Sequence, residues 1–201
     1  MAASNGEVNE MVQYGLMARY GNGVEENKSE ALRYFKMAID EAGHSSAYHY
    51  YGDMIYNCEG IEMNKSEGLE YIKMAAEHRS REAMYKYGEM LRVGTDDVKM
   101  DKAKAAEYFE RTAEDGFPGV CAHYAEMLTK GDGAPMDKEK AISILRNGYD
   151  DPDSLFMLAN ILLEGDGTSA DREGALRYFK LAADKGHESA KETYEKLMNS
   201  K

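Results

Sequence analysis

The sequence has 201 residues and a formal net charge of −12 at pH 7. Such an acidic chain repels phosphate backbones and acidic lipids, and nucleic-acid binding depends mainly on lysine and arginine side chains that neutralise phosphates. The composition therefore argues against nucleic-acid and membrane-surface binding, and the sequence contains no apolar run near the roughly 18 residues that a membrane-spanning helix needs.

The N-terminus and the cysteines indicate the compartment. Residues 1–7 have neither the basic region nor the apolar region of a secretory signal, so we expect a cytoplasmic protein. The two cysteines, Cys58 and Cys121, lie far apart in the sequence, whereas a secreted disulfide scaffold carries more of them, in even numbers. We expect both thiols to be free and partly buried.

One pattern of apolar residues recurs five times along the chain. In each copy a large apolar residue is followed at once by glycine or alanine, and two further apolar positions come shortly after. At 100° per residue these positions share one broad face, as an amphipathic helix requires. The pattern predicts a first helix in each copy, opening at Glu10, Ala47, Ala83, Val120 and Ser154.

A turn and a second helix follow in every copy. The first helix is predicted to end at a glycine, which adopts left-handed backbone without steric cost, except in the second copy, where Cys58 stands instead. The second helix then carries large side chains between alanines, as with Tyr34 and Phe35. Residues that cap helix N-termini precede it: Asn27, Asn64, Asp101, Asp137 and Asp171.

One such helix pair cannot bury its own apolar face, so the copies must stack. We therefore expect an all-α fold, an α/α superhelix built from five helix–turn–helix repeats in a single repeat domain covering residues 1–201. The repeats span approximately 8–44, 45–80, 81–117, 118–151 and 152–187. Residues 188–199 are expected to form a capping helix, whose Ala190, Tyr194 and Leu197 cover the fifth repeat.

The repeated order of residues resembles the Sel-one-like repeat family, whose members are related to tetratricopeptide repeats. The stretch AlaLeuArgTyrPheLysLeuAlaAlaAspLysGlyHis at 175–187 is a very close match, and the resemblance covers roughly Val8 to His187. It implies a right-handed solenoid of antiparallel helix pairs that serves as an adaptor or scaffold in protein complexes. The alternative is a small-molecule-binding or hydrolase-like protein, similar to cysteine-rich bacterial relatives, which carry a cysteine pair within each repeat. Cys58 and Cys121 form no such pairs.

If the first helix of each repeat lines the inner surface, as in tetratricopeptide proteins, one column of residues points into a concave groove. This column is acidic at Asp53, Glu89 and Glu126. We expect the groove to bind a protein or peptide segment that bears lysine or arginine. The alternative is a solvated face whose charges only keep the protein in solution. The predicted partner-binding residues are His49, Asp53, Tyr56, Tyr85, Glu89, Arg92, Glu126, Phe156 and Asn160.

Catalytic and metal-binding signals are weak. His49 and Asp53 lie one helical turn apart, a spacing that is usually a surface contact, and the sequence suggests no third group. The glycine-rich turns at 21–23 and 131–133 join helix to helix and lack the strand and lysine of a phosphate-binding loop. We therefore expect no catalytic residue, no metal site and no cofactor.

Two further features concern packing. The methionine column of the first helices is expected to fill the core. In the first repeat, Val12, Leu16 and Tyr20 form an apolar surface. It could be covered by residues 1–7, by an N-terminal extension, by a partner, or by a second copy, which would mean self-association through this repeat.

Overall fold

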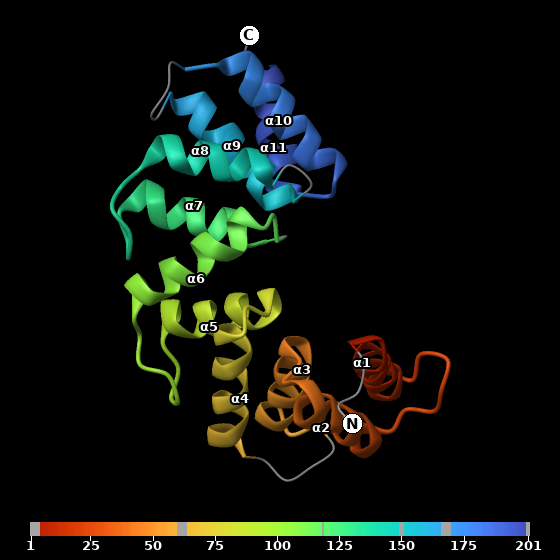
Figure 1. Ribbon diagram of the computed structural model, residues 1–201. Helices are drawn as coiled ribbons and strands as arrows, with labels where there is room; N and C mark the ends of the chain where they lie inside the picture. Colours follow the sequence, from red (N-terminus) through yellow and green to blue (C-terminus); the bar gives the residue numbers. More distant parts are fainter. Residues whose placement is uncertain (1–4, 60–63, 118, 149–150, 166–169, 200–201) are drawn as a thin grey trace. The chain divides into compact units, whose positions relative to one another are not determined.

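The computed structural model describes the chain except for residues 1–4, 60–63, 118, 149–150, 166–169 and 200–201. The described residues form eleven helices and no strand (Figure 1). The helices are α1 (Asn5–Tyr20), α2 (Lys28–Ala42), α3 (Ser45–Tyr56), α4 (Lys65–Glu77), α5 (Arg81–Val93), α6 (Lys102–Glu114), α7 (Val120–Lys130), α8 (Lys138–Asn147), α9 (Pro152–Glu164), α10 (Arg172–Asp184) and α11 (Glu188–Asn199).

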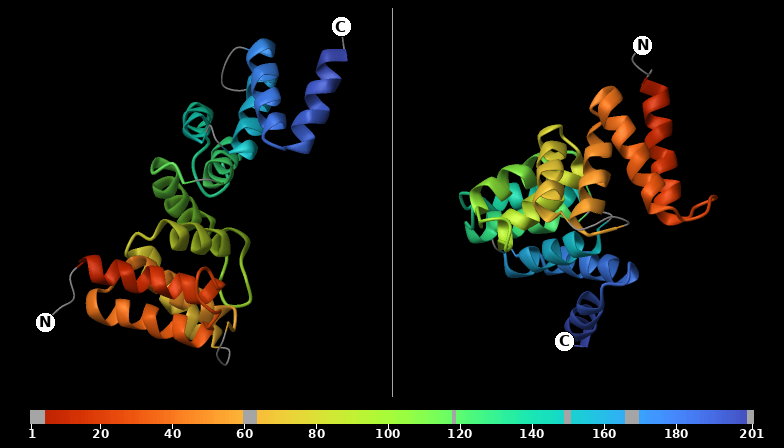
Figure 2. Two further views of the ribbon diagram at one scale, coloured as in Figure 1. Left: turned by 90° about the vertical axis from the view of Figure 1, so that its right-hand side faces the viewer. Right: turned by 90° about the horizontal axis from the view of Figure 1, so that it is seen from below.

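The chain divides into two compact units, which are described separately. Unit 1 comprises Met1–Met90 with Gly94–Lys99, and unit 2 comprises Leu91–Val93 with Met100–Lys201. In unit 1, α1 packs on α2, α2 on α3, and α3 on α4; in unit 2, α6 packs on α7, α7 on α8, α8 on α9, and α9 on α10 (Figure 2). The all-α solenoid of helix pairs is thus confirmed. The prediction of one repeat domain stays a prediction.

Small residues allow the paired helices to approach closely. Gly15 of α1 lies against the ring of Phe35, and a Cβ atom built on Gly15 would stand 2.6 Å from that ring. Between α3 and α4, the backbones meet at Gly52 and Gly68, where a Cβ on either would lie 2.9 Å from the carbonyl oxygen of the other. Such contacts leave no room for a side chain, so the predicted pattern of large and minimal residues is a packing requirement.

The predicted caps of the second helices are present. The Glu30 backbone N–H donates to Asn27 Oδ1 at 3.0 Å, and Asn64 accepts from the Glu67 backbone N–H at 3.1 Å. The Asn64 amide also donates to Glu67 Oε2 at 2.9 Å. These bonds satisfy backbone donors that have no partner within the helix itself. Equivalent side-chain caps stand before α6, α8 and α10.

The second repeat places two ordinary residues in left-handed backbone. Cys58 has φ 62° and Arg79 has φ 63°, at the positions where other repeats have glycines such as Gly21 and Gly43, with φ 68° and 59°. Side chains disfavour this conformation because Cβ comes too close to the backbone. The fold therefore demands the turn even where the sequence does not supply glycine.

Several expectations about burial need correction. Val12 is buried and Leu16 is half-buried, so only Tyr20 of the expected N-terminal apolar surface is largely exposed. Val12 packs into the core of unit 1 together with residues of α2 and α3. Both cysteines are free, but Cys58 is exposed and Cys121 is buried, so neither is partly buried. Of the described helices, none has the length and apolar character needed to cross a membrane.

Candidate functional site

In unit 1, the predicted groove residue Asp53 takes part in an ion-pair network. Its carboxylate, on α3, accepts from Arg19 Nη2 of α1 at 2.5 Å and from the ammonium of Lys86 on α5. Arg19 also holds Glu59 with two bonds, of 3.0 Å from Nε and 2.7 Å from Nη2. Planar two-bond contacts of this kind are among the stronger ion pairs in proteins. Asp53 therefore already has two cationic partners within the chain.

Burial and the two ion pairs have opposite effects on the pKa of Asp53. Burial alone would raise the pKa of Asp53, but the hydrogen bonds from Lys86 and Arg19 outweigh that effect and hold the pKa below its usual value. Asp53 is only 15% exposed, so the ion pairs are poorly screened by solvent. The carboxylate stays charged, and an incoming basic segment would have to displace cations that are already in place.

His49 is buried beside this network, and the expectation of a groove-lining histidine needs correction. The side chain is 9% exposed, and its Nδ1 has no hydrogen-bond partner among the described residues. Burial lowers the pKa of His49 to about 4, although Asp53 and Glu82 act in the opposite direction. The imidazole is therefore neutral at pH 7 and belongs to the interior of unit 1.

The other predicted residues of unit 1 lie at its surface. Tyr56, Tyr85 and Glu89 are all half-buried. The Tyr56 hydroxyl donates to Asp97 at 3.4 Å, and the Lys86 ammonium lies 5.5 Å from the centre of the Tyr56 ring. A cation at that distance is attracted to the ring face. The structure thus brings Tyr56 close to Asp53 through their shared neighbour Lys86.

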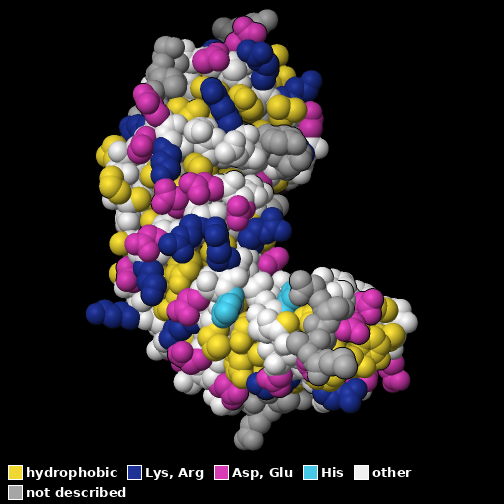
Figure 3. Space-filling model, viewed as in Figure 1, with side chains coloured by type: hydrophobic (Ala, Val, Ile, Leu, Met, Phe, Trp, Pro, Cys, Tyr) yellow, Lys and Arg dark blue, Asp and Glu magenta, His cyan; other side chains and the backbone are white. Residues whose placement is uncertain are grey.

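In unit 2, the predicted residues form two separate groups. Arg92 and Glu126 line a small, polar indentation of about 60 Å³ together with Lys130. Lys130 donates to Glu126 at 2.5 Å, and this bond holds the pKa of Glu126 below its usual value. The acidic column is therefore balanced by cations here too. Figure 3 shows acidic and basic side chains interspersed over the visible face.

Phe156 and Asn160, on α9, make up the second group. The Phe156 ring stacks on His187, with ring centres 4.3 Å apart, and lies 5.8 Å from Phe179. His187 is held in turn by the Ala190 backbone N–H, which donates to its Nδ1 at 3.1 Å. Phe156 therefore connects α9 to the start of α11, and it is half-buried, as is Asn160.

A larger groove lies elsewhere in unit 2, and sequence reasoning missed it. This α6–α8 groove has a volume of about 430 Å³ and is formed by α6, α7, α8 and the turn between α7 and α8. Its lining residues are Ala103, Ala106, Glu107, Glu110, Tyr124, Leu128, Gly133, Ala134, Pro135, Met136, Asp137 and Lys140. The volume of this groove and its apolar lining residues suit an apolar side chain of a bound peptide.

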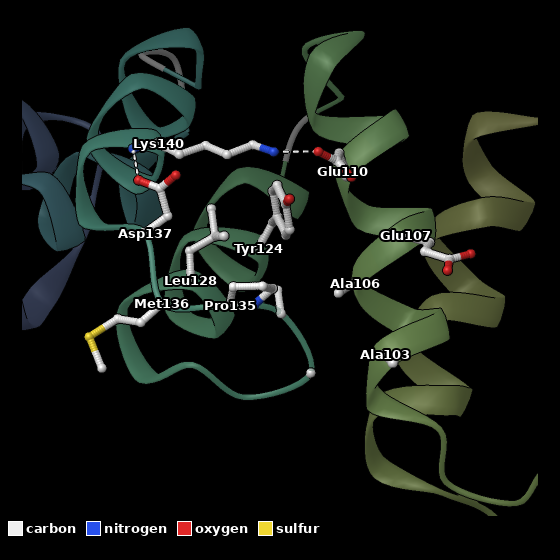
Figure 4. Close-up of a pocket in the computed structure, with 12 residues that line it drawn as sticks. Ala103, Ala106, Glu107, Glu110, Tyr124, Leu128, Pro135, Met136, Asp137 and Lys140 are labelled. Carbon is white, nitrogen blue, oxygen red and sulfur yellow. Dashed lines mark hydrogen bonds and ion pairs between the residues drawn. The ribbon is translucent and has the colours of Figure 1, made fainter.

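Figure 4 shows how these residues lie. Tyr124 and Leu128 of α7 stand between the α6 wall, marked by Ala103, and the turn that carries Pro135. Alanines on α6 leave the space open. The turn itself is fixed, because a Cβ on Gly133 would overlap the carbonyl oxygen of Lys102. Backbone and small side chains therefore fix the position of the turn and of the α6 wall.

An ion pair spans one end of the groove. The Lys140 ammonium of α8 donates to Glu110 of α6, and it lies 5.6 Å from the centre of the Tyr124 ring (Figure 4). The bond to Glu110 raises the pKa of Lys140 above its usual value. Three carboxylates border the groove, Glu107, Glu110 and Asp137, against one ammonium. The groove thus combines an apolar interior with an acidic border.

A sequence signal for this groove exists on the second helices. Glu110 is charged where Lys36 and Lys73 stand in the first two repeats, and Lys140 stands where those repeats have Glu30 and Glu67. This exchange of charge between neighbouring second helices distinguishes this part of the sequence from the first two repeats. The analogy to tetratricopeptide repeats predicts a binding surface on the first helices instead. Among the described residues, no group of three histidine, cysteine or acidic side chains could hold a metal ion.

The fold has counterparts among solved structures. A protective antigen of uropathogenic Escherichia coli with an SLR fold superposes with a TM-score of 0.86 at 22% identity, covering 96% of this chain and 41% of that chain. This chain therefore spans less than half the length of the antigen. An immunity protein of Pseudomonas aeruginosa reaches a TM-score of 0.56 at 13% identity, covering 94% of this chain and 69% of that one. Among curated proteins, none matches this sequence.

A Sel1 repeat protein from Oxalobacter formigenes is more similar in sequence. It has 29% identity and a TM-score of 0.80, with 91% of this chain and 75% of that chain covered. The family model of the Sel1 repeat matches five segments: residues 11–42, 45–80, 81–117, 120–147 and 152–187. Proteins built from this repeat are generally protein-interaction scaffolds and typically not enzymes. Because the five matches account for most of its length, the chain belongs to the Sel1 repeat family.

Proposed function

We propose that this protein is a non-catalytic scaffold that binds a partner segment in the α6–α8 groove. The segment places an apolar side chain against Tyr124 and Leu128 and carries lysine or arginine on either side of it. The observation behind this proposal is the groove itself, an opening of about 430 Å³ with an apolar interior and an acidic border. Buried apolar anchors supply most of the binding energy in such contacts, and charges at the border set orientation.

The acidic border supports a basic partner. Glu107 is exposed on α6, and its carboxylate points away from Tyr124 in Figure 4, so it adds negative charge outside the apolar interior. Asp137 caps α8 by accepting from the Lys140 backbone N–H at 2.9 Å, yet its side chain remains exposed. The net charge of −12 acts in the same sense, because it steers basic partners toward the chain at low salt.

The face of the first helices that carries Asp53, Glu89 and Glu126, called the helix-A face below, remains a second candidate surface for the same function. Its aromatic residues are partly accessible, but Asp53 and Glu126 already have cationic partners within the chain. Displacing such partners reduces the gain from a new ion pair. The α6–α8 groove needs no such exchange for its apolar anchor, which is why we favour it.

Photo-crosslinking can decide between the two surfaces. A crosslinking phenylalanine analogue is placed at Ala103 in the groove, at Glu89 on the helix-A face, or at Lys104 as a control on α6 outside the groove lining. We expect position 103 alone to capture a defined partner segment, which mass spectrometry identifies as apolar with flanking lysine or arginine. Capture from position 89 alone would move the site to the helix-A face and contradict the proposal.

A binding measurement then tests the groove quantitatively with the identified segment as a labelled peptide. Ala103→Trp fills the groove, and Lys104→Trp adds the same side chain at an exposed position beside it. Glu107→Lys reverses a border charge, and Glu114→Lys makes the same change at the end of α6, outside the groove lining. We expect Kd to rise about tenfold or more in the two groove variants and to stay unchanged in the two controls. Equal effects within either pair would argue against the groove.

A further inference from the structure

A second groove in unit 2 lies between α8, α9 and α10. This α8–α10 groove has a volume of about 340 Å³ and is lined by Arg146, Leu162, Asp171, Gly174, Arg177, Tyr178 and Leu181. It is the counterpart of the α6–α8 groove one repeat further along the chain. Leu162 stands in the same repeat position as Leu128, and Asp171 stands in the position of Asp137.

The charges of the two grooves differ in sign. Arg146 occupies the repeat position of Glu110, and Gly174 occupies that of Lys140. The ion pair that spans the end of the first groove is thus replaced by a lone guanidinium. Arg146 is exposed, and no carboxylate in the described part of the chain pairs with it. A second guanidinium, Arg177, lines the same groove; its own contact with Glu173, at 3.8 Å, is long and exposed.

The single carboxylate of the groove is engaged locally. Asp171 accepts from the Gly174 backbone N–H at 2.8 Å, as the cap of α10. Gly174 has no side chain, and the Asp171 carboxylate lies where a Cβ on Gly174 would stand, so no ammonium replaces that of Lys140 here. Two arginines therefore face a groove with one carboxylate, Asp171, among its described lining residues. The charge of this groove is thus opposite in sign to the net charge of −12.

The same groove presents apolar surface. Leu162 is buried, Tyr178 is half-buried, and Leu181 is 47% exposed although it lies beside them. Leu181 thus continues the apolar wall of the groove onto the exposed surface. The two arginines add a polar contact to this apolar surface, because a planar guanidinium binds a carboxylate with two parallel hydrogen bonds. The groove therefore offers both an apolar contact and two carboxylate-binding groups.

We propose that the α8–α10 groove binds an acidic segment of a partner protein. A leucine or aromatic side chain of that segment packs on Leu181 and Tyr178, and its neighbouring glutamate or aspartate side chains pair with Arg146 and Arg177. The apolar wall favours a peptide over a bare anion, and the overall negative charge of the chain disfavours polyanions such as nucleic acid. This site does not depend on the α6–α8 groove, which has the opposite charge preference.

Fluorescence anisotropy with the full chain tests this proposal. The probe is a short labelled peptide with a central leucine–phenylalanine pair flanked by glutamates, and the reference probe carries lysines in place of the glutamates. We expect the acidic probe to bind, and its Kd to rise about tenfold or more in Arg146→Glu and in Arg177→Glu. Leu181→Ser should weaken binding severalfold. Lys180→Glu is the matched control, since it makes the same kind of charge change on α10 outside the groove lining, and it should bind as the wild type does.

Three results would overturn the proposal. One is unchanged affinity in both arginine variants while circular dichroism shows intact helices. Another is equal binding of the acidic and the lysine-flanked probes. The third is full competition by inorganic phosphate at unaltered ionic strength with no effect of Leu181→Ser, which would mean a simple anion site. Glu107→Lys in the α6–α8 groove should leave binding of the acidic probe unchanged, so the failure of either groove can be recognised separately.

Discussion

Replacing His49 with leucine should remove most of the acid sensitivity of unit 1. Burial lowers the pKa of His49 from 6.5 to about 4 in the folded state. Between these pH values His49 is protonated in the unfolded state but not in the folded state, so the free energy of unfolding falls as pH decreases. Across the whole interval the loss amounts to about 3 kcal/mol, because each pKa unit corresponds to about 1.4 kcal/mol. Leucine carries no such proton.

The assay is urea unfolding, followed by helical circular dichroism, at several pH values between about 4 and 7.5. We expect the free energy of unfolding to fall more steeply toward acid in the wild type than in His49→Leu. Asp53 adds little to the slope over most of this range, because its pKa is lowered from 3.8 and most of its contribution is lost below about pH 4. His78→Leu, at an exposed position, should keep the wild-type slope.

Parallel curves for the wild type and His49→Leu would refute this reasoning. They would mean that the protonated imidazole is accommodated in the fold at little cost, through water or through a shift of α3. At neutral pH the leucine variant should be as stable as the wild type or somewhat more so, because it removes a buried nitrogen that has no partner among the described residues. A large loss at neutral pH would indicate that packing, and not protonation, dominates at this position.

Four other substitutions test the local geometry. Arg79→Gly and Cys58→Gly should each increase the free energy of unfolding by up to about 1 kcal/mol, because glycine adopts the left-handed backbone conformation without strain. The melting temperature should rise accordingly, and a lower melting temperature would contradict this. Asp53→Asn should cost about 3 kcal/mol in urea unfolding, since it removes the charge that the buried Arg19 and the half-buried Lys86 share, and an unchanged midpoint would show the network to be unimportant. Gly68→Ala should lower stability by about 2 kcal/mol in the same assay, because the new Cβ would lie 2.5 Å from the Tyr56 backbone nitrogen, although other repeats have alanine there.

Local features of the fold could be predicted from the sequence, because each depends on residues close together in the chain. The N-caps, the glycine turns and the apolar columns all belong to this class. Even Cys58 was correctly recognised as occupying a glycine position, and its φ of 62° confirms the reason. Five copies of the same pattern made these assignments mutually consistent.

The surface could not be predicted to the same degree. Whether Arg19 reaches Asp53 depends on how far each repeat is rotated against the next, and no local pattern encodes that rotation. His49 sits in a column expected to face a partner, yet the neighbouring helices bury it. The α6–α8 groove likewise depends on the separation between Ala103 and the turn at Pro135, which lie in different repeats.

The carboxylate of Asp53 has a consequence for how unit 1 unfolds. In repeat proteins the stability is commonly treated as a sum of independent terms for each repeat and each interface. Here one side chain of the second repeat is shared by a cation of the first and a cation of the third. If the first repeat unfolds locally, Asp53 keeps only its ion pair with Lys86. If Asp53 is replaced, Arg19 and Lys86 lose the negative charge that lies between them. The two interfaces are thus thermodynamically coupled, and mutations on either side of Asp53 should show non-additive energies in a double-mutant cycle.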